Sequence, residues 1–598
     1  MGSVYQSDLK LARLYTVSHC QPICLLFTQK SRGDDRRKTV IPRGKAIEKN
    51  VVGSSVKRRQ LKLPFLVLLA VSLCLWCYSI LTTSVDRIPI SNFPILSMMP
   101  LTYWFGVAAL ILATICWYFS TETRWYHFLL LLPWTLYIFI GPELVEAGIR
   151  GYDTVDHLLG VTYIDQGRFA EYYYKDWPGF ISFSSFLYKI TGVSYYVLPK
   201  LVSISLHLLR TIGILYLGAS LFTNKKHVLL FSLLLVGAFW ENQSFDPCPQ
   251  HLAIIIMMPS LSLFFSTKHL DTKRIVLIMF LFLALLITHV LTPFVVALLV
   301  LFLGFMSLIR RDFGYNRGNN WLIIGILFSI GFAAYLMYAT GWVFQEAVNA
   351  LIKALYDPLL ATQFLIPYSP YQQFVIYLAY SFYAVFILWM FIIAGRKEFW
   401  TKPLERIFPL LCLIPFSFVV IPYGLAALPR FYILGVPFII WFLVKESVKL
   451  RHGIIISFLV VMMLLSFGER YAVEYVTYVP TEEFAGARFI CSKIPLLSKV
   501  MEVAPFDPAP RSMANSLTQP IIVGLQRYIQ PDGSYYWGEP GIHMNFAIES
   551  FRTRNLYFYH LGEEVWSIVS EKYYQPDNFN IIYSCRDYRI YSYGDKTK

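Results

Sequence analysis

The run LPFLVLLAVSLCLWCYSILT, residues 63–82, decides the fold class of this chain. It contains no charged side chain, and about twenty apolar residues in an α-helix are enough to cross the hydrocarbon core of a bilayer. Within the bilayer the backbone must satisfy its own hydrogen bonds, which a helix does. We therefore predict a transmembrane helix at 63–82.

A strongly basic segment precedes this run. Residues 1–62 carry fourteen Lys or Arg against four acidic residues, which accounts for ten of the formal net charge of +15. A basic tail beside a first membrane span is typical of the cytoplasmic side, where it faces anionic lipid headgroups. The tail lacks an apolar core followed by a small-residue cleavage site, so no cleaved signal peptide is expected. We predict a disordered cytoplasmic tail and no nucleic-acid partner.

The rest of the chain repeats the apolar pattern many times. Hydrophobic residues make up 56% of the 598 residues, charged residues only 15%, and the mean hydropathy is +0.52. These values exclude an ordinary soluble domain and predict a predominantly α-helical, multi-pass membrane bundle. We expect about thirteen spans, several of them shorter than about twenty residues, at 63–82, 101–120, 127–140, 195–222, 227–240, 251–266, 275–287, 293–309, 321–340, 374–394, 407–421, 431–444 and 454–467.

The basic residues between the spans predict the orientation of the bundle. With the tail inside, inner loops receive pairs such as Lys225 with Lys226 and Arg310 with Arg311, whereas outer loops hold far fewer cations. This asymmetry is the positive-inside pattern. It predicts a plasma-membrane protein with a cytoplasmic N-terminus and residues 468–598 on the other side.

Residues 468–598 differ sharply in composition from the bundle. They are polar, with many turn signals, and they contain the β-rich runs NIIYS (580–584) and DYRIYSY (587–593). We predict a small extracytoplasmic α+β domain. Its two cysteines, Cys491 and Cys585, are expected either to form a disulfide on the oxidising side or to remain as two buried free thiols.

One outer loop, predicted at 141–194, is unusually rich in polar residues. Its part at 141–192 holds seven acids, one histidine and four cations between apolar runs, and such an insert is the default functional site of a membrane protein. Asp153, Asp156 and His157 stand at i, i+3 and i+4, so they share one face of a helix. Asp176 stands in KDWPGF, where Pro178 and Gly179 are expected to break any helix and hold a turn.

Other polar residues are predicted at the same, outer ends of the spans. They lie in ENQSFDPCPQH (241–251), in ITHVLTP (287–293) and in ALPRFY (427–432). Polar groups placed only for loop solubility would divide between both faces. We therefore expect one outward-facing cavity that contains acids, amides, imidazoles and a guanidinium, among them Asp246, Gln250, His251, His289, Thr292 and Arg430.

These motifs, in this order, resemble the GT-C superfamily of membrane glycosyltransferases. The resemblance covers most of residues 63–470, and it is carried by GYDTVDH (151–157), YYKDWPGF (173–180), NQSFDPCPQHLA (242–253), THVLTPF (288–294) and LPRFYILGVPF (428–438). The combination is similar to archaeal-type members. It implies that 63–467 is a catalytic membrane domain that takes a sugar from a polyprenyl-phosphate carrier and passes it to a glycan, lipid or protein acceptor at the outer face, among membrane lipids.

The resemblance also implies roles for individual residues. By motif position Asp153 is the general base or a metal ligand, and Asp156, Asp176 and Asp246 compete for the role of a second acid. Arg430 is expected to bind the donor phosphate, since a guanidinium offers fixed bidentate geometry. The remaining expectations are phosphate or substrate contacts from His157, Gln250, His251 and His289, sugar stacking by Tyr172, Tyr173, Tyr174 and Trp177, and a divalent cation (Mg or Mn) held by Asp153, Asp156 and His157.

Plainer interpretations accompany each of these assignments. Asp153 could pair with Arg150 or cap a helix, Asp176 could stabilise its turn, and interfacial aromatic residues are more often anchors than sugar platforms. Arg430 could be a boundary charge that reaches toward the headgroups. A transporter or flippase is the rival class, and Arg210 within the fourth predicted span is the residue that best suits it. A receptor or scaffold would not need so many spans.

Overall fold

The computed structural model describes a mainly helical chain. The described residues are 62–85, 94–120, 122–150, 152–171, 175–195, 197–238, 246–265, 271–309, 318–341, 427–447, 452–471, 478–479, 499–502, 521–524, 546–549, 579–585 and 588–593, with single residues between 345 and 392 and between 483 and 493. The predicted basic tail at 1–61 lies outside them.

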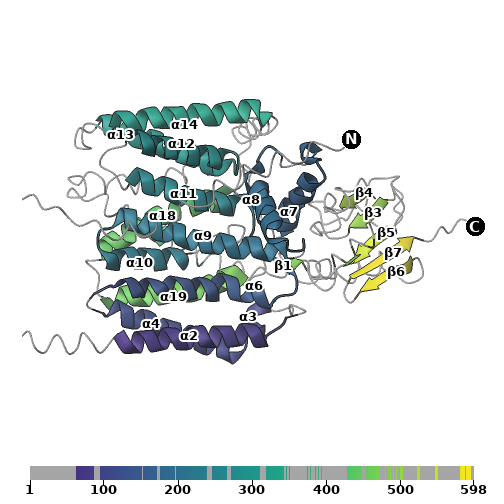
Figure 1. Ribbon diagram of the computed structural model, residues 1–598, viewed down its shortest axis with the longest axis horizontal. Helices are drawn as coiled ribbons and strands as arrows, with labels where there is room; N and C mark the ends of the chain where they lie inside the picture. The colour runs from purple at the N-terminus through teal and green to yellow at the C-terminus, as the bar shows by residue number, and fades with distance from the viewer. Residues whose placement is uncertain are drawn as a thin grey trace, which may run out of the picture. The chain divides into compact units, whose positions relative to one another are not determined.

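The first three predicted spans are helices in the structure. α2 (Lys62–Thr82) lies beside α4 (Leu101–Tyr118), and the Ser79 and Thr102 hydroxyls are 2.8 Å apart between them (Figure 1). The third span runs from Trp125 to Val145 as four consecutive segments. In chain order they are the 3₁₀ turn η2 (Trp125–Leu130), α5 (Leu131–Thr135), the π turn η3 (Leu136–Ile140) and α6 (Gly141–Val145).

Pro142 changes the hydrogen bonding just after the π turn of the third span. Pro142 has no backbone N–H, so the carbonyl of Ile138, four residues earlier, loses its normal helical partner. The hydroxyl of Tyr471, at the end of α19 (His452–Tyr471), donates a hydrogen bond to that carbonyl instead. The backbone carbonyl that Pro142 leaves without a helical partner is thus bound by a tyrosine at the end of another helix.

Six helices after the polar loop follow the predicted apolar runs. Asn224 and Asp271 cap two of them, because their side chains accept hydrogen bonds from the backbone N–H groups of Lys226 (2.8 Å) and Arg274 (2.9 Å). The helices are α9 (Leu198–Leu221), α10 (Lys225–Val236), α11 (Pro249–Phe265), α12 (Thr272–Leu286), α13 (Leu291–Ile309) and α14 (Gly318–Tyr338).

Two further helices, α18 (Ala427–Ser447) and α19 (His452–Tyr471), pack against α10. Among the described residues, five helices are long and apolar enough to cross a membrane, and three shorter apolar helices begin at Pro249, Leu291 and His452. The predicted span at 407–421 lies outside the described residues and the one at 374–394 largely so. The total of thirteen therefore stays a prediction.

The polar loop predicted at 141–194 begins with α6 and continues into two longer helices. α7 (Tyr152–Asp165) packs against α8 (Pro178–Thr191), and a small apolar core that includes Leu158, Phe180 and Val202 joins them to α9. The expectation that Pro178 and Gly179 break any helix was wrong. Proline is compatible with the first position of a helix, where no N–H is needed, and the two residues begin α8.

Short strands complete the described structure. β1 (Ile149–Arg150) pairs antiparallel with β2 (Tyr478–Val479). A five-stranded mixed sheet has the order β4-β3-β5-β7-β6 (Figure 1). Its last two strands confirm the predicted β runs. Cys491, one of the two cysteines of the proposed disulfide, lies outside the described residues. The sheet comprises β3 (Lys499–Glu502), β4 (Ile521–Gly524), β5 (Phe546–Glu549), β6 (Phe579–Cys585) and β7 (Tyr588–Tyr593).

Candidate functional site

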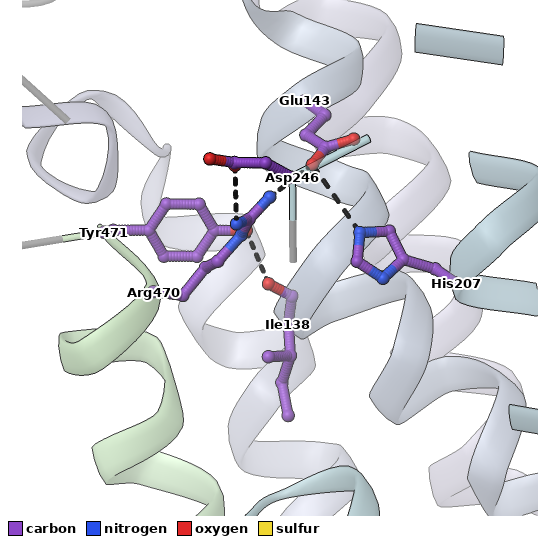
Figure 2. Close-up of polar contacts among 6 residues, drawn as sticks. All are labelled: Ile138, Glu143, His207, Asp246, Arg470 and Tyr471. Atoms are coloured by element: carbon purple, nitrogen blue, oxygen red, sulfur yellow. Dashed lines mark hydrogen bonds and ion pairs between the residues drawn. The ribbon is translucent and has the colours of Figure 1, made fainter. Parts of the chain in front are cut away.

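Four charged or titratable side chains meet inside the bundle and form what we call the Arg470 cluster: Glu143, His207, Asp246 and Arg470 (Figure 2). The Arg470 guanidinium lies between two carboxylates, with Nη2 2.6 Å from Oε1 of Glu143 and Nη1 3.3 Å from Oδ1 of Asp246. His207 Nε2 is 3.6 Å from the same Glu143 oxygen. All four residues are buried.

Three members of the cluster come from the ends of elements that are far apart in the sequence, and the fourth comes from within a helix. Glu143 lies in α6 at the end of the third span, Arg470 in the last turn of α19, and Asp246 just before α11, while His207 projects from α9. Removing a charge from water costs several kcal/mol unless a partner compensates it. The charges therefore stabilise the bundle only while these helix ends remain together.

Aromatic rings and a second guanidinium extend the cluster into the bundle. The Phe139 ring stacks on His207 with centroids 4.8 Å apart, and Arg210 places its guanidinium carbon 4.2 Å from the centroid of the same phenyl ring. His251 lies 5.0 Å from His207, ring to ring. Within this region the two carboxylates are compensated by their ion pairs with Arg470.

A small, partly open pocket adjoins the cluster, with a cavity volume of about 10 Å³, enough for about one water molecule. The Lys200 ammonium, near the start of α9, donates a hydrogen bond to the backbone carbonyl of Glu146. Acidic and basic groups thus face one small space, next to the segment that leads into α7. The lining residues are Glu143, Glu146, Gly148, Pro199, Lys200, Ser203 and Pro247.

The KDWPGF motif is fastened to two other helices. The Tyr335 hydroxyl of α14 donates a hydrogen bond to the backbone carbonyl of Asp176, and the Gly179 N–H donates one to the carbonyl of Ile287 at 2.8 Å, just past the end of α12. Trp177 is buried. The loop that carries Asp176 is therefore held by the bundle.

Gly179 leaves no room for a side chain at this junction. A Cβ there would stand 2.4 Å from Oγ1 of Thr288 and 3.0 Å from the Ile287 carbonyl oxygen. We expect Gly179→Ala to lower the free energy of unfolding by about 1–3 kcal/mol through overpacking. The apparent melting temperature measures this loss of stability. The matched control is Ser182→Ala, because the Ser182 side chain is exposed on the same helix.

The double variant Gly179→Ala/Thr288→Ala identifies the clash. The second change removes the nearest atom, so it should recover part of the loss, whereas additive losses would contradict this origin.

His157 is buried in α7, and its ring meets Phe180 edge-on with centroids 6.0 Å apart. Burial lowers the pKa of His157 from 6.5 to about 3, because the charged imidazolium would lose its hydration. The ring is thus neutral at neutral pH, the form that binds metals, but it packs in an apolar environment typical of a structural histidine.

The low pKa of His157 makes stability depend on pH. Between about pH 6.5 and 3 the unfolded imidazole binds a proton that the folded one does not, so the free energy of unfolding falls by about 1.4 kcal/mol per unit as the pH decreases. We expect His157→Gln to flatten this dependence. Melting temperatures of parent and variant between about pH 7 and about pH 5 test it, and parallel curves would contradict it.

The described residues contain no group of three His, Cys, Asp or Glu side chains that could hold a metal. Asp153 and Asp156 lie in α7, but their side chains are outside the described residues. The divalent-cation site on Asp153, Asp156 and His157 therefore stays a prediction.

The other predicted site residues have different surroundings. Gln250 and His251 are buried in the first turn of α11, and His251 reaches the Arg470 cluster. His289 lies at the start of α13, where its Nδ1 is 3.0 Å from the Thr292 hydroxyl, a local capping contact. The side chain of Arg430, in α18, and the residues Tyr172, Tyr173 and Tyr174 lie outside the described part of the chain.

The sequence analysis named Asp246 and His251 as candidate site residues, and both lie at the Arg470 cluster, but it did not name three of their neighbours. Glu143 and Arg470 each stand three residues after a predicted span, at 127–140 and 454–467, and His207 stands within one. Charges at span ends are a detectable signal. The sequence does not indicate which of these charges pair with each other.

No protein family and no curated protein matches this chain. Among solved structures, the crystal structure of ArnT from Cupriavidus metallidurans bound to undecaprenyl phosphate is similar, with a TM-score of 0.42 and 12% sequence identity over 82% of this chain and 98% of that chain. These values are too low to establish a shared activity.

Proposed function

We propose that this chain is a membrane glycosyltransferase of the GT-C type, which transfers a sugar from a polyprenyl-phosphate carrier to an acceptor at the non-cytoplasmic face. The support comes from the ordered motifs between 151 and 438, and from one structural observation. A buried Arg470 cluster and a pocket with acidic and basic groups lie beside the segment that leads directly into α7, the helix of Asp153.

The reaction explains why such groups are needed. The acceptor hydroxyl attacks the anomeric carbon, the bond between that carbon and the carrier phosphate oxygen breaks, and the carrier leaves as polyprenyl phosphate. Asp153 accepts the hydroxyl proton as general base. The transition state resembles an oxocarbenium ion, and cationic groups compensate the charge of the departing phosphate. Arg430 is the proposed phosphate ligand.

The remaining acids and aromatic residues have supporting roles in this proposal. Asp246 is bound to Arg470 and so serves the structure of the site. Asp176 is the proposed second catalytic acid. Gln250, His251, His289, Tyr174 and Trp177 are the proposed substrate contacts. A divalent cation on Asp153, Asp156 and His157 stays a prediction, which loss of transfer in EDTA and its recovery with Mg or Mn would support.

The direct test uses purified protein in liposomes with a panel of radiolabelled polyprenyl-phosphate sugars. Transfer of label into a lipid, glycan or protein fraction supports the proposal and also identifies the acceptor class. If no donor of the panel is consumed or bound, the proposal fails.

Arg430 provides a second test, of donor binding. We expect Arg430→Ala to weaken binding of polyprenyl phosphate at least about tenfold, because a bidentate charge-assisted contact is worth about 1.5–3 kcal/mol. Arg430→Lys should retain part of the affinity, since a lysine keeps the charge but not the geometry. Equal affinity in parent and Arg430→Ala, measured by lipid titration, would remove the assignment.

One observation favours the rival class. Arg210 is buried in α9, twelve residues from the first residue of that helix, and buried charges within spans often mark transport pathways. A flippase would move a fluorescent polyprenyl-phosphate lipid across a vesicle membrane without transferring its sugar. That outcome would replace the transferase proposal.

A further inference from the structure

The short segment between α6 and α7 is held from several directions. The N–H of Val85, after α2, donates to the Val145 carbonyl at 2.9 Å, and the N–H of Ala147 donates to the Val85 carbonyl at 3.1 Å. The Lys200 ammonium donates to the carbonyl of Glu146. Backbone groups of this segment are therefore bound by Lys200 of α9 and by Val85, three residues after the end of α2.

A later part of the chain completes this attachment. Ile149 pairs with Val479 and Arg150 with Tyr478, so β1 is held by residues that follow α19. The same end of α19 supplies Arg470, which is ion-paired to Glu143 in α6. We call these two contacts, the β1–β2 ladder and the Arg470–Glu143 ion pair, the latch.

We propose that the latch positions Asp153. Only Gly151 lies between β1 and the first residue of α7, Tyr152, and Asp153 is the second residue of that helix. Consecutive Cα atoms are about 3.8 Å apart, so the first turn of α7 must stay close to the end of β1, and a displacement of β1 moves Asp153 with it. The segment after α19 is thus a positioning element for the proposed catalytic base.

A two-residue ladder is weak by itself, so the two contacts of the latch depend on each other. Isolated short strand pairs are marginally stable in water, so β1 and β2 stay together because Arg470 and Glu143 hold the adjoining helix ends. Loss of either contact should let α7 shift. A catalytic group displaced by about 1 Å can cost about a hundredfold in rate, without loss of substrate binding.

Cross-linking tests the geometry without any assumption about activity. In an antiparallel pair the partners have Cα atoms about 4.5–5.5 Å apart, within the range of a disulfide. Ile149→Cys/Val479→Cys should therefore cross-link on oxidation, as seen by peptide mass spectrometry. Successive residues of a strand face opposite sides, so Ile149→Cys/Tyr478→Cys is the matched control that should not cross-link. Equal cross-linking of both pairs, or of neither, would overturn the inference.

Hydrogen exchange and turnover test the positioning role. Arg470→Gln removes the ion pair, and Tyr478→Pro/Val479→Pro removes the ladder while it leaves the Arg470 cluster intact. In each variant the amides of 152–165 should exchange hydrogen at least about tenfold faster than in the parent. Oxidation of the cysteine pair in the Arg470→Gln background should restore the slow exchange. Unchanged exchange in both variants would overturn the proposal.

The catalytic consequence rests on the proposed function. In an active enzyme, the same variants should lower kcat about ten- to a hundredfold, leave the Kd for polyprenyl phosphate within about threefold, and recover kcat on oxidation. A loss of kcat that the cross-link fails to restore would overturn the positioning role. If the parent transfers no sugar while the cross-link forms and exchange responds, the proposed function fails and the latch stands.

Discussion

Asp153→Asn should lower the rate of sugar transfer by about 10²–10⁴-fold, the usual contribution of a general base. Asparagine has nearly the same size as aspartate, but it does not take up the proton of the acceptor hydroxyl at neutral pH. Donor binding should change little, because the base acts on the acceptor. The measurement is the initial rate of label transfer, together with lipid titration for donor affinity.

A neighbouring acid supplies the control for this prediction. Asp156 lies three residues further along α7, so Asp156→Asn makes the same chemical change one turn away. We expect a smaller loss of rate there, unless a metal is shared by both carboxylates, in which case EDTA should also abolish transfer. Parent-like turnover of Asp153→Asn would remove the proposed base.

Arg470→Met should destabilise the protein by about 3–5 kcal/mol, the usual cost of removing one partner from a buried ion pair. The change leaves the buried carboxylates of Glu143 and Asp246 without the guanidinium that lies 2.6 Å and 3.3 Å from their oxygens. Methionine has a similar length, so little of the loss comes from an empty cavity. The apparent melting temperature, or the half-life in detergent, gives the readout.

Two comparisons separate the charge effect from other causes. Arg274, whose Nε is 3.8 Å from Oδ2 of Asp271 in an exposed pair, provides the control, and Arg274→Met should cost less than about 1 kcal/mol. The triple variant Glu143→Gln/Asp246→Asn/Arg470→Met removes all three charges and should recover much of the stability. A triple variant as unstable as the single one would show that the carboxylates are not the source of the loss.

Much of the local structure followed from sequence patterns alone. The apolar runs at 63–82 and 101–120 became α2 and α4, since an uncharged run of this length is stable in a bilayer only as a helix. The alternating residues at 580–584 and 587–593 became β6 and β7. Asp246 and His251 were predicted to join a common polar site, and both lie at the Arg470 cluster.

The pairing of distant groups was decided only by the tertiary structure. Glu143 and Arg470 stand 327 residues apart, and nothing in the spacing of either indicates the other as its partner. The two-residue strands β1 and β2 are too short to leave a periodic signal. Hydrophobicity and turn chemistry act over a few residues and so can be recognised in the sequence, whereas the assembly of buried charges depends on which helix ends pack together.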